Sequence, residues 1–269
     1  MAAKIFLPLG ALFLALLLFT GGCAVLPEVQ EEEAGDKPEN SGEAETASVV
    51  LTYYGQSAFL MEADKKILVD PYRPELGYGR IDLPVDLVTI SHHHFDHDYA
   101  EGGRGARVLL GLSPDGEWQQ VEEDAGFARI YSVNTYHDSS SGSWLGKNSI
   151  FVFEIAGLRL AHAGDLGHPL GPDEMEQIGP VDLLLIPVGG HYTLPYEAIQ
   201  QVIEGLKPAV VIPMHYRTGY YGDHNLGSLQ DFLNQDLPYP VCEKGSSITV
   251  SKEDMPASTE IWAMEFQLP

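Results

Sequence analysis

Residues 90–98, ISHHHFDHD, contain four of the ten histidines of the chain together with two aspartates. Side chains two positions apart in an extended segment point the same way, so His92 and His94 can bind one metal ion. Asp96 and His97 follow directly and can face a second ion. Imidazole and carboxylate ligands together suit zinc, manganese or ferrous iron. This stretch alone leaves three interpretations open: a mononuclear site, a dinuclear site and a surface tract that binds metal by accident.

Three more potential ligands lie further along the chain, which a surface histidine tract would not predict. They are His137 in YHDSSSG, Asp165 in AGDLGH and His215 in PMHYRT. Asp165 and His215 each follow a strand-like apolar segment, and Asp70 ends the strand-like segment KILVD. Side chains at strand ends can meet at one edge of a sheet, where binding and catalytic groups commonly sit. The sequence therefore predicts a metal site at a sheet edge.

Short apolar segments bounded by Gly, Pro and Asp dominate the chain from Val49 onward, which is typical of strands. The candidate strands are residues 49–54, 57–62, 66–70, 86–90, 107–111, 149–155, 158–162, 182–187, 209–213, 247–250 and 260–266. Helical patterns occur in residues 172–178, 195–206 and 227–235. The first strands are spaced for an antiparallel meander, and helices come between later strands. Because no linker separates the two parts, residues 48–269 are predicted to form one mixed α/β domain.

The motif HHHFDH, followed in order by His137, Asp165 and His215, resembles the metallo-β-lactamase-fold hydrolases. The resemblance runs from about Val50 to Thr218. The segments GQSAFLMEADKKILVDPY, GKNSIFVFEIAGLRLAHAGDLGH and IPVGGHYTLPYEAIQQVIEGLKPAVVIPMHY are similar to one branch of that family. This branch includes ascorbate-6-phosphate lactonases and N-acyl-phosphatidylethanolamine phospholipase D. The resemblance implies a four-layer αββα sandwich of the metallo-β-lactamase type, with the site at one edge between the two sheets.

The resemblance also assigns roles residue by residue. It implies one divalent cation on His92, His94 and His137, a second on Asp96, His97 and His215, and Asp165 bridging the two. Asp70 matches an aspartate that orients a ligand in this family. The cations are expected to be Zn²⁺, with Mn²⁺ or Fe²⁺ as alternatives, and to hold a hydroxide for hydrolysis. Asp96 and Asp165 would be the catalytic carboxylates beside that hydroxide.

Other polar side chains near these segments have two interpretations each. His162 either orients a ligand or is a strand histidine bonded to the backbone. His191 follows a strand expected to end near the metals, so it contacts either substrate or solvent. Arg217 either binds an anionic group of the substrate or forms a surface ion pair. For the aromatic residues we favour packing beneath a loop over a role as pocket walls; these residues are Tyr192, Tyr220 and Tyr221.

The N-terminal residues resemble a secretory leader followed by a linker. Residues 1–23 contain an apolar stretch that is short for a membrane-spanning helix. Their last residues, TGGC, resemble a bacterial lipobox that would carry lipid on Cys23; a plain signal peptide and an uncleaved anchor are the alternatives. Residues 24–47 are rich in Glu, Gly and Pro and are predicted to be a disordered acidic tether. Residues 48–269 are thus expected outside the cytoplasm, held on a bacterial membrane by lipid.

The formal net charge of −24 restricts the possible partners. Nucleic-acid phosphates are bound by clustered Lys and Arg, and the chain has no basic run, so nucleic acid is excluded as a partner. The predicted activity is membrane-tethered, metal-dependent hydrolysis of an ester, lactone or phosphodiester in a small-molecule or lipid-derived substrate. The alternatives are a binding lipoprotein that keeps the fold and a metal without catalysis, and a di-iron oxidoreductase.

Overall fold

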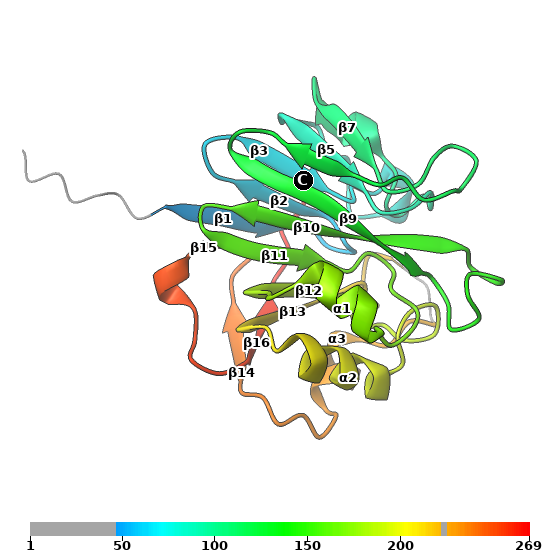
Figure 1. The fold of residues 1–269 in the computed structure, drawn as a ribbon, viewed down its shortest axis with the longest axis vertical. Coiled ribbons are helices and arrows are strands. Elements are labelled where there is room, and N and C mark those ends of the chain that lie inside the picture. The colour runs from blue at the N-terminus through cyan, green and yellow to red at the C-terminus, as the bar shows by residue number, and fades with distance from the viewer. Residues whose placement is uncertain (1–46, 222–224) are drawn as a thin grey trace, which may run out of the picture. The chain divides into compact units, whose positions relative to one another are not determined.

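Two sheets make up most of the structure. The computed structural model describes residues 47–221 and 225–269 (Figure 1). One sheet has six strands in the order β15–β1–β2–β3–β5–β7. These strands are β1 (Ser48–Tyr53), β2 (Phe59–Glu62), β3 (Lys66–Val69), β5 (Leu87–Ile90), β7 (Arg107–Leu110) and β15 (Ser247–Ser251). The antiparallel pairing of β1 with β2 and of β2 with β3 confirms the predicted meander.

The other large sheet has eight strands in the order β14–β16–β13–β12–β11–β10–β9–β8. Its strands are β8 (Glu122–Asp124), β9 (Ala128–Tyr136), β10 (Lys147–Ile155), β11 (Leu158–His162), β12 (Leu183–Pro187), β13 (Val210–Met214), β14 (Val241–Lys244) and β16 (Glu260–Met264). Pairing is antiparallel from β8 to β11 and parallel from β11 to β14. A separate short ribbon pairs β4 (Leu83–Pro84) with β6 (Gly103–Arg104).

In the part of the chain that the structure describes, three α-helices lie beside the eight-stranded sheet, as Figure 1 shows. They are α1 (Pro172–Ile178), α2 (Tyr196–Leu206) and α3 (Leu229–Leu233), at the three positions predicted from the sequence. In α2 the residues Ala198, Val202 and Leu206 share the face that is buried in the core.

The predicted α/β sandwich is therefore confirmed, but its fourth layer is thin. A second apolar cluster, which includes Leu60, Leu68 and Tyr72, lies on the outer face of the six-stranded sheet. Among the described residues, the helices of this region are the short 3-10 helices Pro74–Leu76 and Ala100–Gly102.

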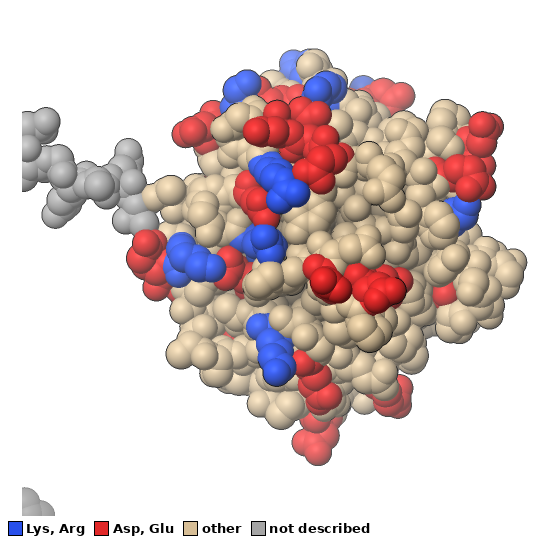
Figure 2. Space-filling model, in the orientation of Figure 1, with Lys and Arg blue, Asp and Glu red and all other residues tan. Residues whose placement is uncertain are grey.

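Most basic side chains of the described surface lie beside acidic ones. On the face drawn in Figure 2, Lys and Arg side chains lie near Asp or Glu and do not gather into a patch. Ion pairs of the described surface include Arg107 with Glu123, Arg129 with Glu122, and Lys252 with Asp182. Exposed pairs of this kind each contribute about 0–1 kcal/mol to stability. They neutralise one another, so these cations are not presented together to an anionic partner.

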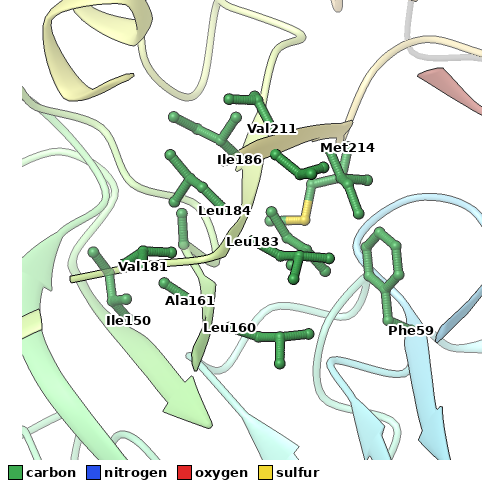
Figure 3. Packing of buried hydrophobic residues seen from close by; sticks show 14 of the residues in the cluster. Phe59, Ile150, Leu160, Ala161, Val181, Leu183, Leu184, Ile186, Val211 and Met214 are labelled. Atoms are coloured by element: carbon green, nitrogen blue, oxygen red, sulfur yellow. The ribbon is translucent and has the colours of Figure 1, made fainter. Parts of the chain in front are cut away.

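The main core combines side chains from both sheets. In β1, alternate residues Val49, Leu51 and Tyr53 point into this core, as the two-residue repeat of a strand requires. Figure 3 shows part of the cluster, in which Phe59 of β2 lies with residues of β10, β11, β12 and β13. Leu160 and Met214 are among these partners from the eight-stranded sheet. Their packing fixes the distance between the two sheets and so between the strand ends that carry the polar residues.

The nine-residue strand β9 was not predicted, although it is one of the two longest described strands. Its buried positions include Ser132 and Thr135 as well as Ile130 and Val133. The polar residues interrupt the apolar pattern on which a strand prediction depends. Pairing with the apolar strand β10 over nine residues nevertheless holds this segment in the sheet.

The carboxyl ends of several strands meet at one edge of the sandwich. In the six-stranded sheet, β3 and β5 run parallel. In the eight-stranded sheet, β11, β12 and β13 run parallel to one another, and β9 runs in the same direction because both β9 and β11 are antiparallel to β10. All of the predicted metal ligands follow the ends of β5, β9, β11 and β13, and Asp70 follows β3.

The predicted leader and most of the predicted tether, residues 1–46, lie outside the described residues. Strand β1 begins at Ser48, where the predicted domain begins. Within residues 47–221 and 225–269, none of the helices combines the length and apolar character that crossing a membrane requires.

We expect the substitution Phe59→Ala to lower the free energy of unfolding by about 3–5 kcal/mol, the usual range for such a truncation in a core. The Phe59 side chain is 0% exposed, and its ring stacks on Tyr53 with centroids 4.5 Å apart. Urea unfolding followed by circular dichroism measures the change. Val108→Ala is the control, because Val108 is 37% exposed and should change stability by about 0.5 kcal/mol or less. Equal effects of the two substitutions would contradict the packing described here.

Candidate metal centre

The predicted ligands form two adjacent groups. The first consists of His92, His94, His137 and Asp165, and the second of Asp96, His97, His215 and Asp165. Within each group, one potential ligand atom per residue lies within 4.8 Å of all the others. Asp165 belongs to both groups. The structure therefore brings together all seven side chains that the sequence indicated, in the same two sets.

The motif after β5 delivers four of these side chains from one short segment. His92 and His94 lie close together, with His92 Nε2 and His94 Nδ1 3.0 Å apart. The backbone then turns, and the His97 N–H donates to the His94 carbonyl at 2.9 Å. This turn carries Asp96 and His97 to the second group. His92 and His94, before the turn, thus belong to the first ligand group, and Asp96 and His97, in the turn, belong to the second.

Asp165 lies at the centre of the arrangement. Its Oδ2 atom is 3.0 Å from His137 Nε2 and 3.1 Å from His215 Nε2, and its Oδ1 atom is 3.2 Å from His97 Nε2. The backbone before it has a left-handed glycine, Gly164, with a φ of 54°. A Cβ atom on Gly164 would lie 2.4 Å from Asn148 Oδ1, which is too close. The same Asn148 oxygen accepts from the Asp165 N–H at 3.1 Å and so fixes the carboxylate in place.

Several buried polar atoms at this centre have no hydrogen-bond partner. They are His97 Nε2, Asp165 Oδ1, and both ring nitrogens of His215. Buried polar atoms are normally satisfied, because leaving one unpaired costs about 1–3 kcal/mol. Imidazole nitrogens and carboxylate oxygens that converge without partners match the donor set of a divalent transition-metal ion. The second group, with the shared Asp165, therefore fits a bound metal ion, and the first group offers the same types of donor.

The pKa values of the metal-free centre are strongly shifted. Burial alone would lower the pKa of His215, but the carboxylates of Asp165 and Asp96 outweigh it and raise this pKa to about 9. The same carboxylates raise the pKa of His97, also against the effect of burial. Burial would raise the pKa values of Asp96 and Asp165, yet the histidines hold both well below the usual range. Without metal, two protonated imidazoles therefore balance the two carboxylates.

Hydrogen bonds from the opposite ring nitrogens orient the histidines. Ser91 Oγ donates to Asp70 Oδ2 at 2.5 Å, so it accepts from His92 Nδ1 at 2.9 Å. His97 Nδ1 donates to Asp70 Oδ2 at 2.9 Å, and His137 Nδ1 donates to the Tyr192 carbonyl at 3.1 Å. Each bond leaves Nε2 facing the centre, as metal binding requires. Asp70, which the sequence singled out, thus supports two of the candidate ligands.

Gln56 and Asn148 also contact the candidate ligands but were missed from the sequence. Gln56 Nε2 donates to Asp96 Oδ2 at 2.8 Å, and the Gln56 carbonyl accepts from the His215 N–H at 2.7 Å. Both Gln56 and His215 have left-handed backbone, with φ of 50°. Such conformations are uncommon outside glycine and are found where surrounding contacts enforce them. The only sequence signal was the position of Gln56 in the segment GQSAF between two strands.

Three further predicted residues are placed differently from the ligands. His162 is buried, donates from Nε2 to the Ser57 carbonyl at 2.9 Å and accepts on Nδ1 from the Gly164 N–H. His191 is exposed, and Arg217 lies 3.8 Å from Asp231 in a partly exposed ion pair. Neither His191 nor Arg217 lines the cavity over the ligands. The structure thus matches the backbone interpretation for His162 and the ion-pair interpretation for Arg217.

The ligand groups open into a cavity of about 290 Å³. It is lined by His94, Phe95, Asp96, His137, Leu145, Asp165, Tyr192, His215, Tyr221 and Leu226. Tyr192 and Tyr221 are therefore pocket walls, and our expectation that they pack beneath a loop was wrong for these two. Tyr220 does pack, stacking on Tyr78 with ring centroids 5.7 Å apart.

Comparison with known proteins identifies the family. Residues 50–215 match the model of the β-lactamase superfamily domain. The chain is 33% identical over 195 residues to the UPF0173 metal-dependent hydrolase of Pyrococcus abyssi. The aligned region covers 63% of this chain and 85% of that protein. The chain is 31% identical over 193 residues to the corresponding protein of Thermococcus onnurineus, with the same two shares. The chain therefore belongs to the metallo-β-lactamase superfamily, in the UPF0173 family of metal-dependent hydrolases.

Solved structures agree with this assignment. A Thermotoga maritima protein assigned to the Zn-dependent hydrolases of the metallo-β-lactamase superfamily superposes with a TM-score of 0.63 and 31% identity. The match covers 81% of this chain and 100% of the other. Igni18, a metallo hydrolase of Ignicoccus hospitalis, gives a TM-score of 0.54 at 24% identity over 76% of this chain and 99% of that one. The second likeness supports the fold alone.

We expect the apparent affinity for Zn²⁺ to fall as the pH is lowered below about 9, the raised pKa of His215. Below this pH a metal ion must displace the imidazole proton, whereas above it the ring is already neutral. Calorimetry at neutral pH in two buffers of different ionisation enthalpy should therefore detect proton release when zinc binds. Zinc binding without proton release would contradict these protonation states.

We expect Asp70→Asn to weaken metal binding by about 10- to 100-fold, the range for losing an indirect partner of a metal ligand. Asparagine removes the negative charge that holds the protons of His97 Nδ1 and Ser91 Oγ in place. Competition with a chromogenic chelator measures the affinity. Asp98→Asn is the matched control, because Asp98 follows the same motif but pairs with Arg73. The assignment fails if the two variants bind zinc equally well.

Proposed function

We propose that this member of the family hydrolyses an ester, lactone or phosphodiester with water activated between two divalent cations. The observation that carries the proposal is the position of Asp165, whose two oxygens face histidines of both ligand groups. A single metal site would not need a carboxylate shared in this way. Zn²⁺ is the cation best suited to such a set of imidazoles and carboxylates, with Mn²⁺ and Fe²⁺ as alternatives.

Two bound cations would lower the pKa of a shared water toward neutrality, polarise the scissile group and stabilise the negative charge that develops on it. The protein side chains hold this arrangement. Asp165 would join the two sites, while Asp96 completes the second and is itself held by the Gln56 amide at 2.8 Å. Asp70 and the Tyr192 carbonyl keep the Nδ1 protons on His97 and His137. Their Nε2 lone pairs therefore stay directed to the centre.

The nucleophile is assigned to water because the chain supplies no obvious side-chain alternative. The sequence has no Gly-x-Ser-x-Gly elbow of the kind that activates a serine. The side chains that line the cavity include no cysteine, serine, threonine or lysine within the described residues. Direct attack by water also agrees with the hydrolase assignment of the family.

We further propose that the enzyme works outside the cytoplasm, tethered to a bacterial membrane. The support is sequence alone: the apolar leader, the lipobox-like TGGC ending at Cys23 and the acidic residues 24–47. A flexible linker of that length spans roughly 25–30 Å, and like-charge repulsion extends it further. Mass spectrometry of the protein from a bacterial membrane fraction tests this proposal, which requires a lipid-modified N-terminus at Cys23.

The activity test uses the full-length chain reconstituted separately with zinc and with manganese. We expect metal-dependent turnover of at least one class among bis(p-nitrophenyl) phosphate, simple lactones and carboxylic esters. Asp165→Asn should reduce it by more than about 100-fold, the upper end even for indirect partners of a metal site. Asp173→Asn, on the exposed first turn of α1, is the control and should be fully active. Two bound metals with no turnover of any class would instead favour the non-catalytic binding lipoprotein.

A further inference from the structure

The cavity over the ligands has a second surface with a different chemical character. Five of its lining residues are not candidate ligands: Phe95, Leu145, Tyr192, Tyr221 and Leu226. All five are aliphatic or aromatic, and two tyrosine hydroxyls are their only polar side-chain atoms. The rings of Phe95 and Tyr221 meet edge to face with centroids 6.3 Å apart. Any molecule that fills this cavity therefore contacts apolar surface as well as the candidate ligands.

Leu145 is held on the wall by a tightly bonded loop. The Asp138 carboxylate accepts hydrogen bonds from the N–H groups of Ser140, Gly142, Trp144 and Leu145, at 2.7–3.0 Å. Four backbone donors on one carboxylate hold the backbone of this loop in place. The position of Leu145 on the apolar wall is therefore fixed by the hydrogen bonds of its own loop.

Outside the candidate metal ligands, the described residues that line the same cavity include no basic side chain. No Lys or Arg of the described chain lines it. Arg217, only two residues after His215, lies 3.8 Å from Asp231 instead. The net charge of −24 adds a field that repels anions. A substrate with an anionic group away from the metals would lose its water there without gaining a partner, which is costly.

The size of the cavity limits the substrate as well. At about 290 Å³ it is at the small end of ligand pockets, which span about 300–1,000 Å³. A compact group fits this space, whereas a long acyl chain would have to leave it. The apolar walls, the lack of Lys and Arg among the described lining residues and the small volume all favour a compact, uncharged group.

Building on the proposed hydrolase function, we propose that the substrate is an uncharged carboxylic ester or lactone with a compact apolar substituent. The substituent lies against Phe95, Leu145 and Tyr221, and the carbonyl faces the ligand groups. Hydrolysis adds water across the acyl C–O bond: the water oxygen bonds to the carbonyl carbon, and the leaving oxygen takes a proton. The products are an alcohol and a carboxylic acid, joined in one molecule when a lactone opens. Phosphorylated molecules and intact phospholipids are disfavoured as substrates.

The test uses the full-length, zinc-loaded chain with γ-butyrolactones that differ only in the γ substituent. Methyl, ethyl and propyl lactones form the apolar series, and a carboxymethyl lactone is the charged counterpart of the ethyl lactone. We expect kcat/KM to rise about fourfold for each added methylene, the factor for burying one CH₂ group. The carboxymethyl lactone should be turned over more slowly than the ethyl lactone. Bis(p-nitrophenyl) phosphate is assayed in parallel as the phosphodiester.

Two variants at one position connect this selectivity to the wall. Leu145→Ala should flatten the dependence on chain length, and Leu145→Arg should raise turnover of the carboxymethyl lactone relative to the ethyl lactone. Trp144→Ala is the matched control: Trp144 directly precedes Leu145 on the same loop, is 66% exposed and does not line the cavity. It should keep the wild-type dependence. Zinc content measured for every variant separates an effect on the wall from loss of metal.

The possible failures are distinguishable. Turnover of the phosphodiester with no turnover of lactones, or with no dependence on the apolar substituent, would overturn the proposed substrate and leave the hydrolase function standing. Chain-length dependence that survives in Leu145→Ala but is lost in Trp144→Ala would likewise overturn it. Zinc-loaded protein that hydrolyses neither these compounds nor the simple carboxylic esters of the activity test would contradict both proposals.

Discussion

The structure depends on holding two carboxylates among imidazole rings inside a buried site. Asp165 is only 2% exposed, and nitrogens of three histidines lie within 3.2 Å of its oxygens. Carboxylates buried alone would take up protons, because the interior disfavours their charge. The protonated forms of His97 and His215 prevent this in the metal-free protein. Divalent cations can take the place of those protons, so the same arrangement of side chains suits the metal-free and the metal-bound protein. Metal binding is therefore coupled to proton release.

The sandwich supplies the rigidity that this centre needs. His92, His94, Asp96 and His97 follow a strand of the six-stranded sheet, whereas His137, Asp165 and His215 follow strands of the other. The apolar core between the sheets therefore sets the distance between the two halves of each ligand group. Hydrogen bonds donated by the opposite ring nitrogens to Ser91, Asp70 and the Tyr192 carbonyl then fix the rings. A shift in either sheet would misplace ligands, which explains why strand ends and not long loops carry them.

Local patterns predicted much of this arrangement, and contacts between distant segments account for what was missed. The spacing of His92, His94, Asp96 and His97 is a local pattern, and so is the apolar face of α2. Gln56 has no such signal, because its role is a hydrogen bond to a residue 40 positions away. Strand β9 was hidden by the buried polar residues Ser132 and Thr135. The apolar walls were also missed, since Leu145 and Leu226 come together only when two loops meet over the ligands.

Crystals of the zinc-loaded protein, with anomalous diffraction recorded at the zinc absorption edge, test the central claim most directly. The account predicts two anomalous peaks, one among His92, His94 and His137 and the other among Asp96, His97 and His215, with the Asp165 carboxylate between them. A single peak, or peaks elsewhere in the molecule, would contradict the shared dinuclear site on which the proposed function rests.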